Sequence, residues 1–300
     1  MRVLVTGASG WIGSAVTPAL LAAGHDVLGL ARSDASARAI EALGAEPVRG
    51  TLDDADSVGA AATKADGVVH LAYHHDFSQM AEAAAMDRAA IDAIGTALTG
   101  TGGPFVVASG TLGLAVGRLG TEADAPDPAT HPRVANGQHA LDYAASDVRT
   151  IATRFAPTVH GGGDLGFIAT IAKVARDRGF SAYIDDGANR WPAVNRADAA
   201  ALVARAVDDA PARSVLHAVA EQGITTREIA EAIGRTLGLP VRSVARAGAA
   251  EHFGWIGMFF GLDCPVSNDV TRELLQWEPN HQGLIADIEA GYYPGTDAHS

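Results

Sequence analysis

The sequence predicts an α/β fold, a doubly wound parallel sheet covered by helices on both faces, with a smaller mixed lobe after it. Two observations predict this fold. Short apolar runs alternate with longer alanine-rich stretches through the first half of the chain, which is typical of buried parallel strands joined by helices. After residue 160 this alternation becomes irregular. We therefore expect one unit over residues 1–160 and a second unit, interleaved with the first, over residues 161–300.

The elements of the first half follow one another in a regular order. Strands are expected at residues 3–5, 27–30, 46–48, 68–71, 105–108 and 150–155, and helices at 11–23, 36–43, 79–97 and 134–146. In the first helix, Ile12, Val16 and Leu20 lie on one face, and Pro18 predicts a kink or an irregular turn. Residues 110–133 are rich in Gly, Pro, Asp and Thr and predict a long loop, which in compact domains is usually functional or mobile.

The second half is expected to contain more helix than strand. Helices are expected at residues 165–178, 197–207, 226–237 and 270–276, and strands at 182–184, 215–218 and 241–244. Thr225 followed by Glu228 predicts a capping box at the start of the third of these helices.

A glycine-rich loop joins the first strand to the first helix and carries the strongest functional pattern in the chain. It reads Thr6-Gly7-Ala8-Ser9-Gly10-Trp11-Ile12-Gly13. The first glycine allows a tight turn, the second lets the backbone approach a pyrophosphate, and the third lets the helix pack on the sheet. The amides at the helix start would face the phosphates. The pattern predicts a Rossmann-type dinucleotide site, with a plain glycine turn as the alternative. The loop residues expected to bind are Gly7, Ser9, Gly10, Trp11, Ile12 and Gly13.

The end of the second strand indicates which dinucleotide is bound. An Asp or Glu there binds the ribose 2′-hydroxyl of NAD, whereas an arginine accommodates the 2′-phosphate of NADP. Here Ala31 stands in the acidic position, and Arg32 and Ser33 follow with a guanidinium and a hydroxyl. We expect NADP(H) rather than NAD(H). The alternative is that Arg32 is a solvated surface residue.

Composition excludes several classes of partner. The net charge of −13 argues against nucleic acid, which needs basic patches, and against anionic membranes. The single cysteine, Cys264, excludes an internal disulfide and cannot form a metal site alone. No apolar run approaches the length of a membrane span, and the N-terminus lacks the pattern of a signal peptide. We expect a cytoplasmic protein that acts on a small molecule, without nucleic acid, membrane or metal.

With these motifs in place, the chain resembles the extended branch of the short-chain dehydrogenase/reductase superfamily, including the NAD-dependent epimerases and dehydratases. The spacing of the three loop glycines is the extended-type pattern, and residues 191–199 and 271–279 are similar to family segments of the second lobe. The resemblance implies that Leu52 lies beside the adenine, that Leu71 and Ala72 lie beneath the cofactor, and that Pro157 lies near the nicotinamide. It also implies a homodimer.

The chain departs from this family at its catalytic pair, a tyrosine followed four residues later by lysine. The tyrosines of this chain are Tyr73, Tyr143, Tyr183, Tyr292 and Tyr293, and the residues four positions after them are Phe77, Asp147, Gly187, Thr296 and Asp297. The family places the pair near residues 129–133 of this chain. Arg133 could therefore stand near the position of the lysine and contact the ribose, although an arginine cannot be deprotonated as a lysine can.

Other residues at the carboxyl edge of the sheet could carry the chemistry. Ser109 ends the fifth strand, where the family places a substrate-binding hydroxyl, and Thr111 follows it; either hydroxyl could instead cap a loop. Tyr73-His74-His75-Asp76 follows the fourth strand. His75 beside Asp76 is the first candidate proton donor and Tyr73 the second, unless these are ordinary loop residues. Tyr143 lies too late in its helix and is expected to pack.

These observations predict an NADP(H)-dependent oxidoreductase that moves a hydride between nicotinamide and a small, partly apolar carbonyl compound or activated alkene. The aromatic residues of segment 252–262 could wall an apolar pocket or could equally form core or dimer packing. Two other functions stay open. One is a redox-silent protein that senses the cofactor, and the other is an epimerase or dehydratase that retains it.

Overall fold

The computed structural model describes residues 1–74, 79–115, 117–125 and 132–293, and it confirms the predicted α/β fold. A seven-stranded parallel sheet has the order β10-β6-β5-β4-β1-β2-β3. Its strands are β1 (Arg2–Thr6), β2 (Asp26–Ala31), β3 (Glu46–Arg49), β4 (Gly67–His70), β5 (Pro104–Gly110), β6 (Arg149–Phe155) and β10 (Ser214–Ala218). The order reverses at β1, between β2 and β4, where sheets of this kind bind ligands at the carboxyl ends of their strands.

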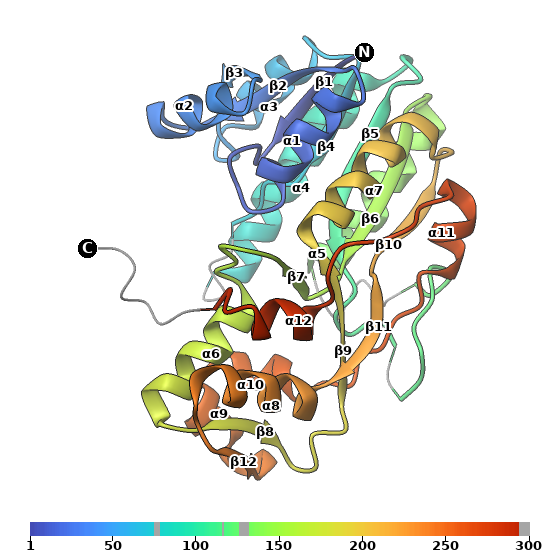
Figure 1. Ribbon diagram of the computed structural model, residues 1–300. Coiled ribbons are helices and arrows are strands. Elements are labelled where there is room, and N and C mark those ends of the chain that lie inside the picture. The colour runs from blue at the N-terminus through green and yellow to red at the C-terminus, as the bar shows by residue number, and fades with distance from the viewer. Residues whose placement is uncertain (75–78, 116, 126–131, 294–300) are drawn as a thin grey trace.

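Helices cover both faces of this sheet (Figure 1). On one face lie α1 (Gly13–Ala22), α2 (Asp34–Ala42) and α7 (Arg196–Asp209), whose apolar side chains share a core with β1 and β6. On the other lie α3 (Ala55–Ala62), α4 (Met80–Leu98) and α5 (Pro132–Asp142), which continues as a 3₁₀ turn over Tyr143–Ser146. Both layers exclude water from the strands, so polar groups approach the sheet mainly at its carboxyl edge.

The second half of the chain forms the lower lobe in Figure 1 and returns β10 to the large sheet. This lobe has a three-stranded sheet of order β11-β9-β7 and a two-stranded sheet of order β12-β8. Its strands are β7 (Thr158–His160), β8 (Ser181–Ile184), β9 (Arg190–Asn195), β11 (Glu221–Thr225) and β12 (Val241–Val244). Its helices are α6 (Phe167–Arg178), α8 (Thr226–Leu237), α9 (Ala249–Phe253), α10 (Ile256–Phe260) and α12 (Leu284–Glu289), with a 3₁₀ turn at Arg246–Gly248. Helix α11 (Asp269–Leu275) instead packs against α7 and β10 beside the large sheet (Figure 1).

Most predicted elements are present, with differences at their ends. The capping box of α8 is confirmed, because the Thr225 hydroxyl accepts a hydrogen bond from the Glu228 amide and the Glu228 carboxylate accepts one from the Thr225 amide. Helix α1 begins at Gly13 rather than at residue 11 and continues past Pro18. No helix among the described residues is long and apolar enough to cross a membrane.

Candidate active site

The glycine loop between β1 and α1 adopts a turn that side chains at its glycines would disrupt. Gly7 has a φ of +71°, and a Cβ there would lie 2.9 Å from the amide nitrogen of Ala72. A Cβ on Gly13 would lie 2.1 Å from the carbonyl oxygen of Gly7, which already accepts a 2.9 Å hydrogen bond from the Gly10 amide. The backbone is therefore held in a tight cradle against the segment that follows β4.

Free backbone donors make this cradle a fit for a pyrophosphate. The amides of Trp11 and Ile12 donate no hydrogen bond to any described residue, and they stand at the start of α1, where the helix dipole favours an anion. The Trp11 indole donates a 2.8 Å hydrogen bond to the Val159 carbonyl. The Arg196 guanidinium lies over the indole, 4.0 Å from the centre of the indole ring. These contacts tie the loop to β7 and to the start of α7. Pro157 is half-buried between β6 and β7, two residues before Val159.

The end of β2 presents a cluster of charged and polar groups where the adenosine ribose would lie. Arg32 is exposed and forms no ion pair within the described part of the chain. Ser33 caps α2 by accepting a 3.2 Å hydrogen bond from the Ser36 amide. Arg49, at the end of β3 and in register with Ala31, forms an ion pair with Asp34. Arg49 is a second cation at this site, and it was not predicted from the sequence. Leu52 is buried just beyond it.

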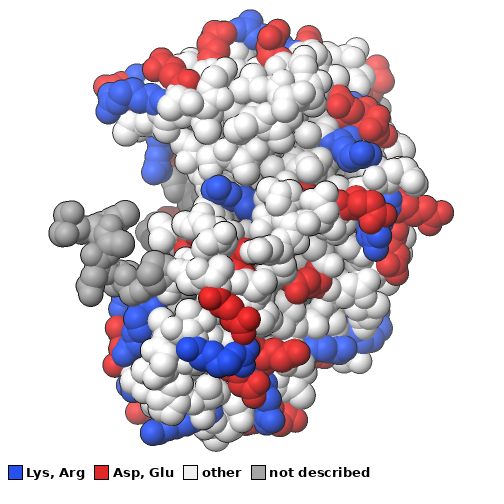
Figure 2. Space-filling model, in the orientation of Figure 1, with Lys and Arg blue, Asp and Glu red and all other residues white. Residues whose placement is uncertain are grey.

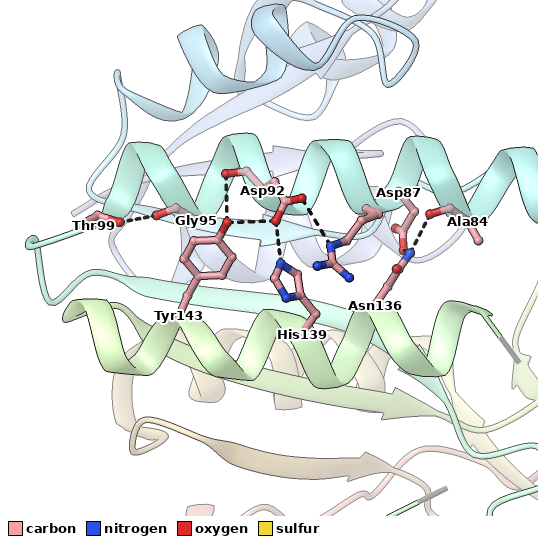
Figure 3. Close-up of polar contacts among 9 residues, drawn as sticks. Ala84, Asp87, Asp92, Gly95, Thr99, Asn136, His139 and Tyr143 are labelled. Atoms are coloured by element: carbon pink, nitrogen blue, oxygen red, sulfur yellow. Dashed lines mark hydrogen bonds and ion pairs between the residues drawn. The ribbon is translucent and has the colours of Figure 1, made fainter. Parts of the chain in front are cut away.

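A buried polar network underlies the centre of the carboxyl edge. The Thr6 hydroxyl lies 2.8 Å from His70 Nδ1, and His70 Nε2 lies 3.2 Å from Asp87. Asn136 donates from one amide nitrogen to Asp87 and to the Ala84 carbonyl, both at 2.7 Å (Figure 3). Burial would raise the pKa of Asp87, but the hydrogen bonds from His70 and Asn136 and the nearby charge of Arg133 outweigh it and lower the pKa. Asp87 is thus a fixed negative charge that ties α4 to β4 and α5.

Tyr73 and Arg133 meet above this network. The Arg133 guanidinium lies over the Tyr73 ring, 4.0 Å from its centre. Burial raises the pKa of Tyr73 above its ordinary value of 10.0; the Asp87 charge adds to the increase and Arg133 opposes it. The Tyr73 hydroxyl is therefore protonated at neutral pH and able to donate a proton.

Ser109 lies beneath α5, the helix that carries Arg133. A Cβ on Gly137 would lie 3.5 Å from the Ser109 hydroxyl, so the helix passes directly over it. Arg133 is one turn before Gly137 on the same face of α5. Tyr73, Ser109 and Arg133 thus come from three segments that converge at one end of α5. Thr111 is completely buried, and its hydroxyl has no hydrogen-bond partner among the described residues.

Comparison with known proteins shows the family to which the chain belongs. The profile of the NAD dependent epimerase/dehydratase family matches residues 3–97. An uncharacterized protein of Schizosaccharomyces pombe is 44% identical over 295 residues, covering 98% of this chain and 100% of that protein. The 2'-dehydrokanamycin reductase of Streptomyces kanamyceticus is 30% identical over 262 residues, covering 82% of this chain and 69% of the reductase. The chain belongs to the NAD-dependent epimerase/dehydratase family of extended short-chain dehydrogenases/reductases.

A solved member of the same fold supports the assignment of the architecture. The UDP-glucose 4-epimerase of Thermus thermophilus, crystallised with NAD, superposes with a TM-score of 0.75 over 99% of this chain and 100% of that one, at 21% identity. This likeness concerns the fold. In this chain the amides of Leu71 and Ala72 donate hydrogen bonds of 3.2 and 3.1 Å to the Thr6 hydroxyl. These bonds hold the segment after β4 against Gly7.

The remaining predicted site residues lie in several places. His74 Nε2 lies 3.4 Å from Asp53 Oδ1, which brings the segment after β4 next to the turn after β3. His75 and Asp76 lie outside the described residues. Tyr143 packs against Gly95 and donates a 2.9 Å hydrogen bond to Asp92, which also contacts His139, far along α5 from Arg133 (Figure 3). Tyr143 is therefore a packing residue of the family fold here, as expected.

The aromatic segment divides between core and surface. Phe253 and Phe260 are buried with Trp191. Trp255 is 46% exposed and Met258 68% exposed. Phe167 stacks on Phe259 with ring centres 5.9 Å apart. Leu112, from the loop after β5, packs against this aromatic cluster, which places the cluster beside the segment that begins at Ser109.

Three buried groups, His70, Asp87 and Asn136, were not predicted from the sequence. A signal for two of them was present. On α4, Asp87 takes the inward position between Ala83 and Ala90, and Asn136 takes a buried position on α5 one turn before Ala140. A polar residue at a position that the helical period marks as inward needs a partner, and here each is the partner of the other.

Proposed function

We propose that this protein is an NADP(H)-dependent oxidoreductase that reduces a carbonyl group of a small, partly apolar and uncharged organic substrate. The observation that carries the proposal is the convergence of Tyr73, Arg133 and Ser109 at the carboxyl edge of the sheet, next to the segment that presses on Gly7. The residues of the glycine loop fit a bound dinucleotide, which supplies the hydride when present.

The side chains of this site suit a carbonyl acceptor. Hydride addition to the carbonyl carbon leaves negative charge on the oxygen, which then takes up one proton. The Tyr73 hydroxyl, protonated at neutral pH, would give that proton, and the Ser109 hydroxyl would hold the same oxygen by a hydrogen bond. Arg133 would stabilise the tyrosinate that remains, and Asp87 would balance the charge of Arg133.

The second lobe supports an uncharged substrate. Every arginine and lysine from residue 161 to residue 293 already contacts a carboxylate, a carbonyl oxygen or an aromatic ring. Figure 2 shows basic side chains of this lobe lying beside acidic ones. The rings of Phe167, Trp255 and Phe259 offer apolar surface instead. The name of the Streptomyces relative, a reductase of a dehydro compound, is consistent with ketone reduction.

The preference for NADP(H) rests on the end of β2. Arg32 is exposed with no ion pair in the described structure, Ser33 begins α2, and Ala31 leaves no carboxylate on the strand to bind a 2′-hydroxyl. Arg49 would add a second positive charge if the 2′-phosphate displaced Asp34 from it.

The proposal is tested by mixing the protein with NADPH and a panel of uncharged ketones and aldehydes, and following the loss of NADPH absorbance together with alcohol formation. Turnover that depends on Tyr73 supports the proposal. Tight NADPH binding with no turnover on any compound that binds would favour a sensor of cofactor state instead. Copurified dinucleotide that does not exchange with added NADPH would favour an epimerase or dehydratase.

A further inference from the structure

A buried row of polar side chains crosses the sheet beyond Ser109. In the parallel register, Ser109 of β5 is paired with Arg154 of β6, and Arg154 with His217 of β10. Paired residues of neighbouring strands project to the same face, and such strands lie about 4.8 Å apart. Ser109 lies under Gly137, so this is the face that α5 covers.

Arg154 is poorly satisfied for a buried cation. Arg154 is 8% exposed. Among the described residues it forms one hydrogen bond, which Nη1 donates to His217 Nε2 at 3.4 Å. His217 is neutral, because burial lowers its pKa, and its Nδ1 donates to the Ser267 carbonyl at 2.7 Å. The Arg154 fork has five N–H donors, so most of its donating capacity is not used.

The neighbouring carboxylates balance the charge of Arg154 without binding it. Glu122 and Asp124 are the acidic groups that act on it electrostatically, yet neither forms an ion pair with it among the described contacts. Glu122 accepts hydrogen bonds from the amide and the hydroxyl of Thr271, and Asp124 is bound by Arg118. Because Arg118 already pairs with Asp124, Glu122 is left to balance the charge of Arg154. The surroundings therefore carry no surplus positive charge for an anion and favour a neutral oxygen acceptor.

A second arginine on the same strand, Arg149, uses its guanidinium donors in hydrogen bonds within the protein. Arg149, five residues earlier, projects to the opposite face of β6, where its guanidinium donates to the carbonyls of Ala206, Val207 and Ala210 at the end of α7. Arg149 therefore has a structural role that Arg154 lacks.

We propose that Arg154 is a substrate-specificity residue that donates hydrogen bonds to a second neutral oxygen of the substrate while Ser109 holds the reacting carbonyl. This inference rests on the proposed function. Because the two strands are neighbours, the second oxygen lies about two to four bonds from the reacting carbon. Ketones with an adjacent carbonyl or hydroxyl oxygen are the favoured class, and simple ketones are poorer substrates.

The test compares phenylpropanedione, which has two adjacent carbonyls, with propiophenone, which has one. Kd is measured on the NADP⁺-loaded protein and kcat/KM with NADPH, in the natural protein, Arg154→Met and the control Arg149→Met. We expect the natural protein and Arg149→Met to prefer the diketone, and Arg154→Met to lose about tenfold to hundredfold of that preference while propiophenone is unchanged. Arg154→Lys keeps the positive charge and should lose part of the preference for the diketone. This variant provides the test if Arg154→Met does not fold.

The outcomes separate this inference from the proposed function. If diketone binding depends on Arg154 but no NADPH is consumed, the role of Arg154 in binding is supported and the proposed reductase function is refuted. Equal losses for both ketones, an unchanged preference in Arg154→Met, or no binding of either ketone to the natural protein would overturn the role of Arg154.

Discussion

Replacing Gly13 by alanine should abolish tight cofactor binding through a clash of known size. The new Cβ would lie 2.1 Å from the Gly7 carbonyl oxygen and 2.8 Å from its carbonyl carbon. Non-bonded carbon and oxygen atoms need roughly 3.2 Å, so the loop or the helix start must move by about 1 Å. The amides of Trp11 and Ile12 move with it. A displacement of about 1 Å in a positioned site commonly costs on the order of a hundredfold.

We expect Gly13→Ala to raise the Kd for NADPH by about a hundredfold, and the overpacking to lower the free energy of unfolding by about 1–3 kcal/mol. Isothermal titration calorimetry measures the first quantity and urea denaturation the second. Gly10→Ala should have a smaller effect, because its Cβ would meet the Gly7 oxygen at 3.1 Å. Gly248→Ala, whose Cβ would have an ordinary 3.6 Å contact with Val244, is the control. A Gly13→Ala protein that is folded and binds NADPH like the control would refute the reasoning.

Three further predictions follow from the site. Arg32→Ala should raise the Kd for NADPH about tenfold to hundredfold and leave that for NADH within twofold, which paired titrations measure; equal effects on both would remove Arg32 from the 2′-phosphate. Tyr73→Phe should lower kcat about 10²–10⁴-fold with NADPH affinity unchanged, and an unaltered kcat in steady-state assays would exclude Tyr73 as proton donor. Asp87→Asn should cost roughly 3 kcal/mol of unfolding free energy at pH 7. Because folding lowers the pKa of Asp87, its contribution is present above the ordinary carboxyl pKa of 3.8 and is lost as pH falls below it, so the two proteins should converge in acid; a pH-independent difference would contradict this.

The large sheet and the glycine loop could be predicted from the sequence because both depend on local pattern. Apolar runs between helices specify parallel strands, and the glycine spacing specifies the cradle. The strands of the two-stranded sheet, β8 and β12, were predicted, but the three-stranded sheet of the second lobe was missed for an equally local reason. Strand β9 contains Pro192 and β11 contains Gly223, residues that usually argue against strands. The two strands nevertheless pair through the residues on either side, and the register shifts between Glu221 and Ile224, where Gly223 lies.

The site was only partly predictable because its partners are far apart in the sequence. Ser109 and Tyr73 could be placed at the carboxyl edge from their positions after strands. That Arg133 lies over Tyr73 depends on where α5 crosses the sheet, which no local pattern encodes. The same holds for Asp87 and Asn136, which are 49 residues apart and meet only when α4 packs against α5.

The most direct measurement follows a labelled hydride. The protein is incubated with NADPH that carries deuterium at the transferable position of the nicotinamide and with phenylpropanedione, and the product is analysed by mass spectrometry and NMR. We predict a hydroxyketone with one deuterium on the newly formed carbinol carbon, and far less of it from Tyr73→Phe. Recovery of unlabelled diketone and intact labelled NADPH, from protein shown to bind both, would contradict the account.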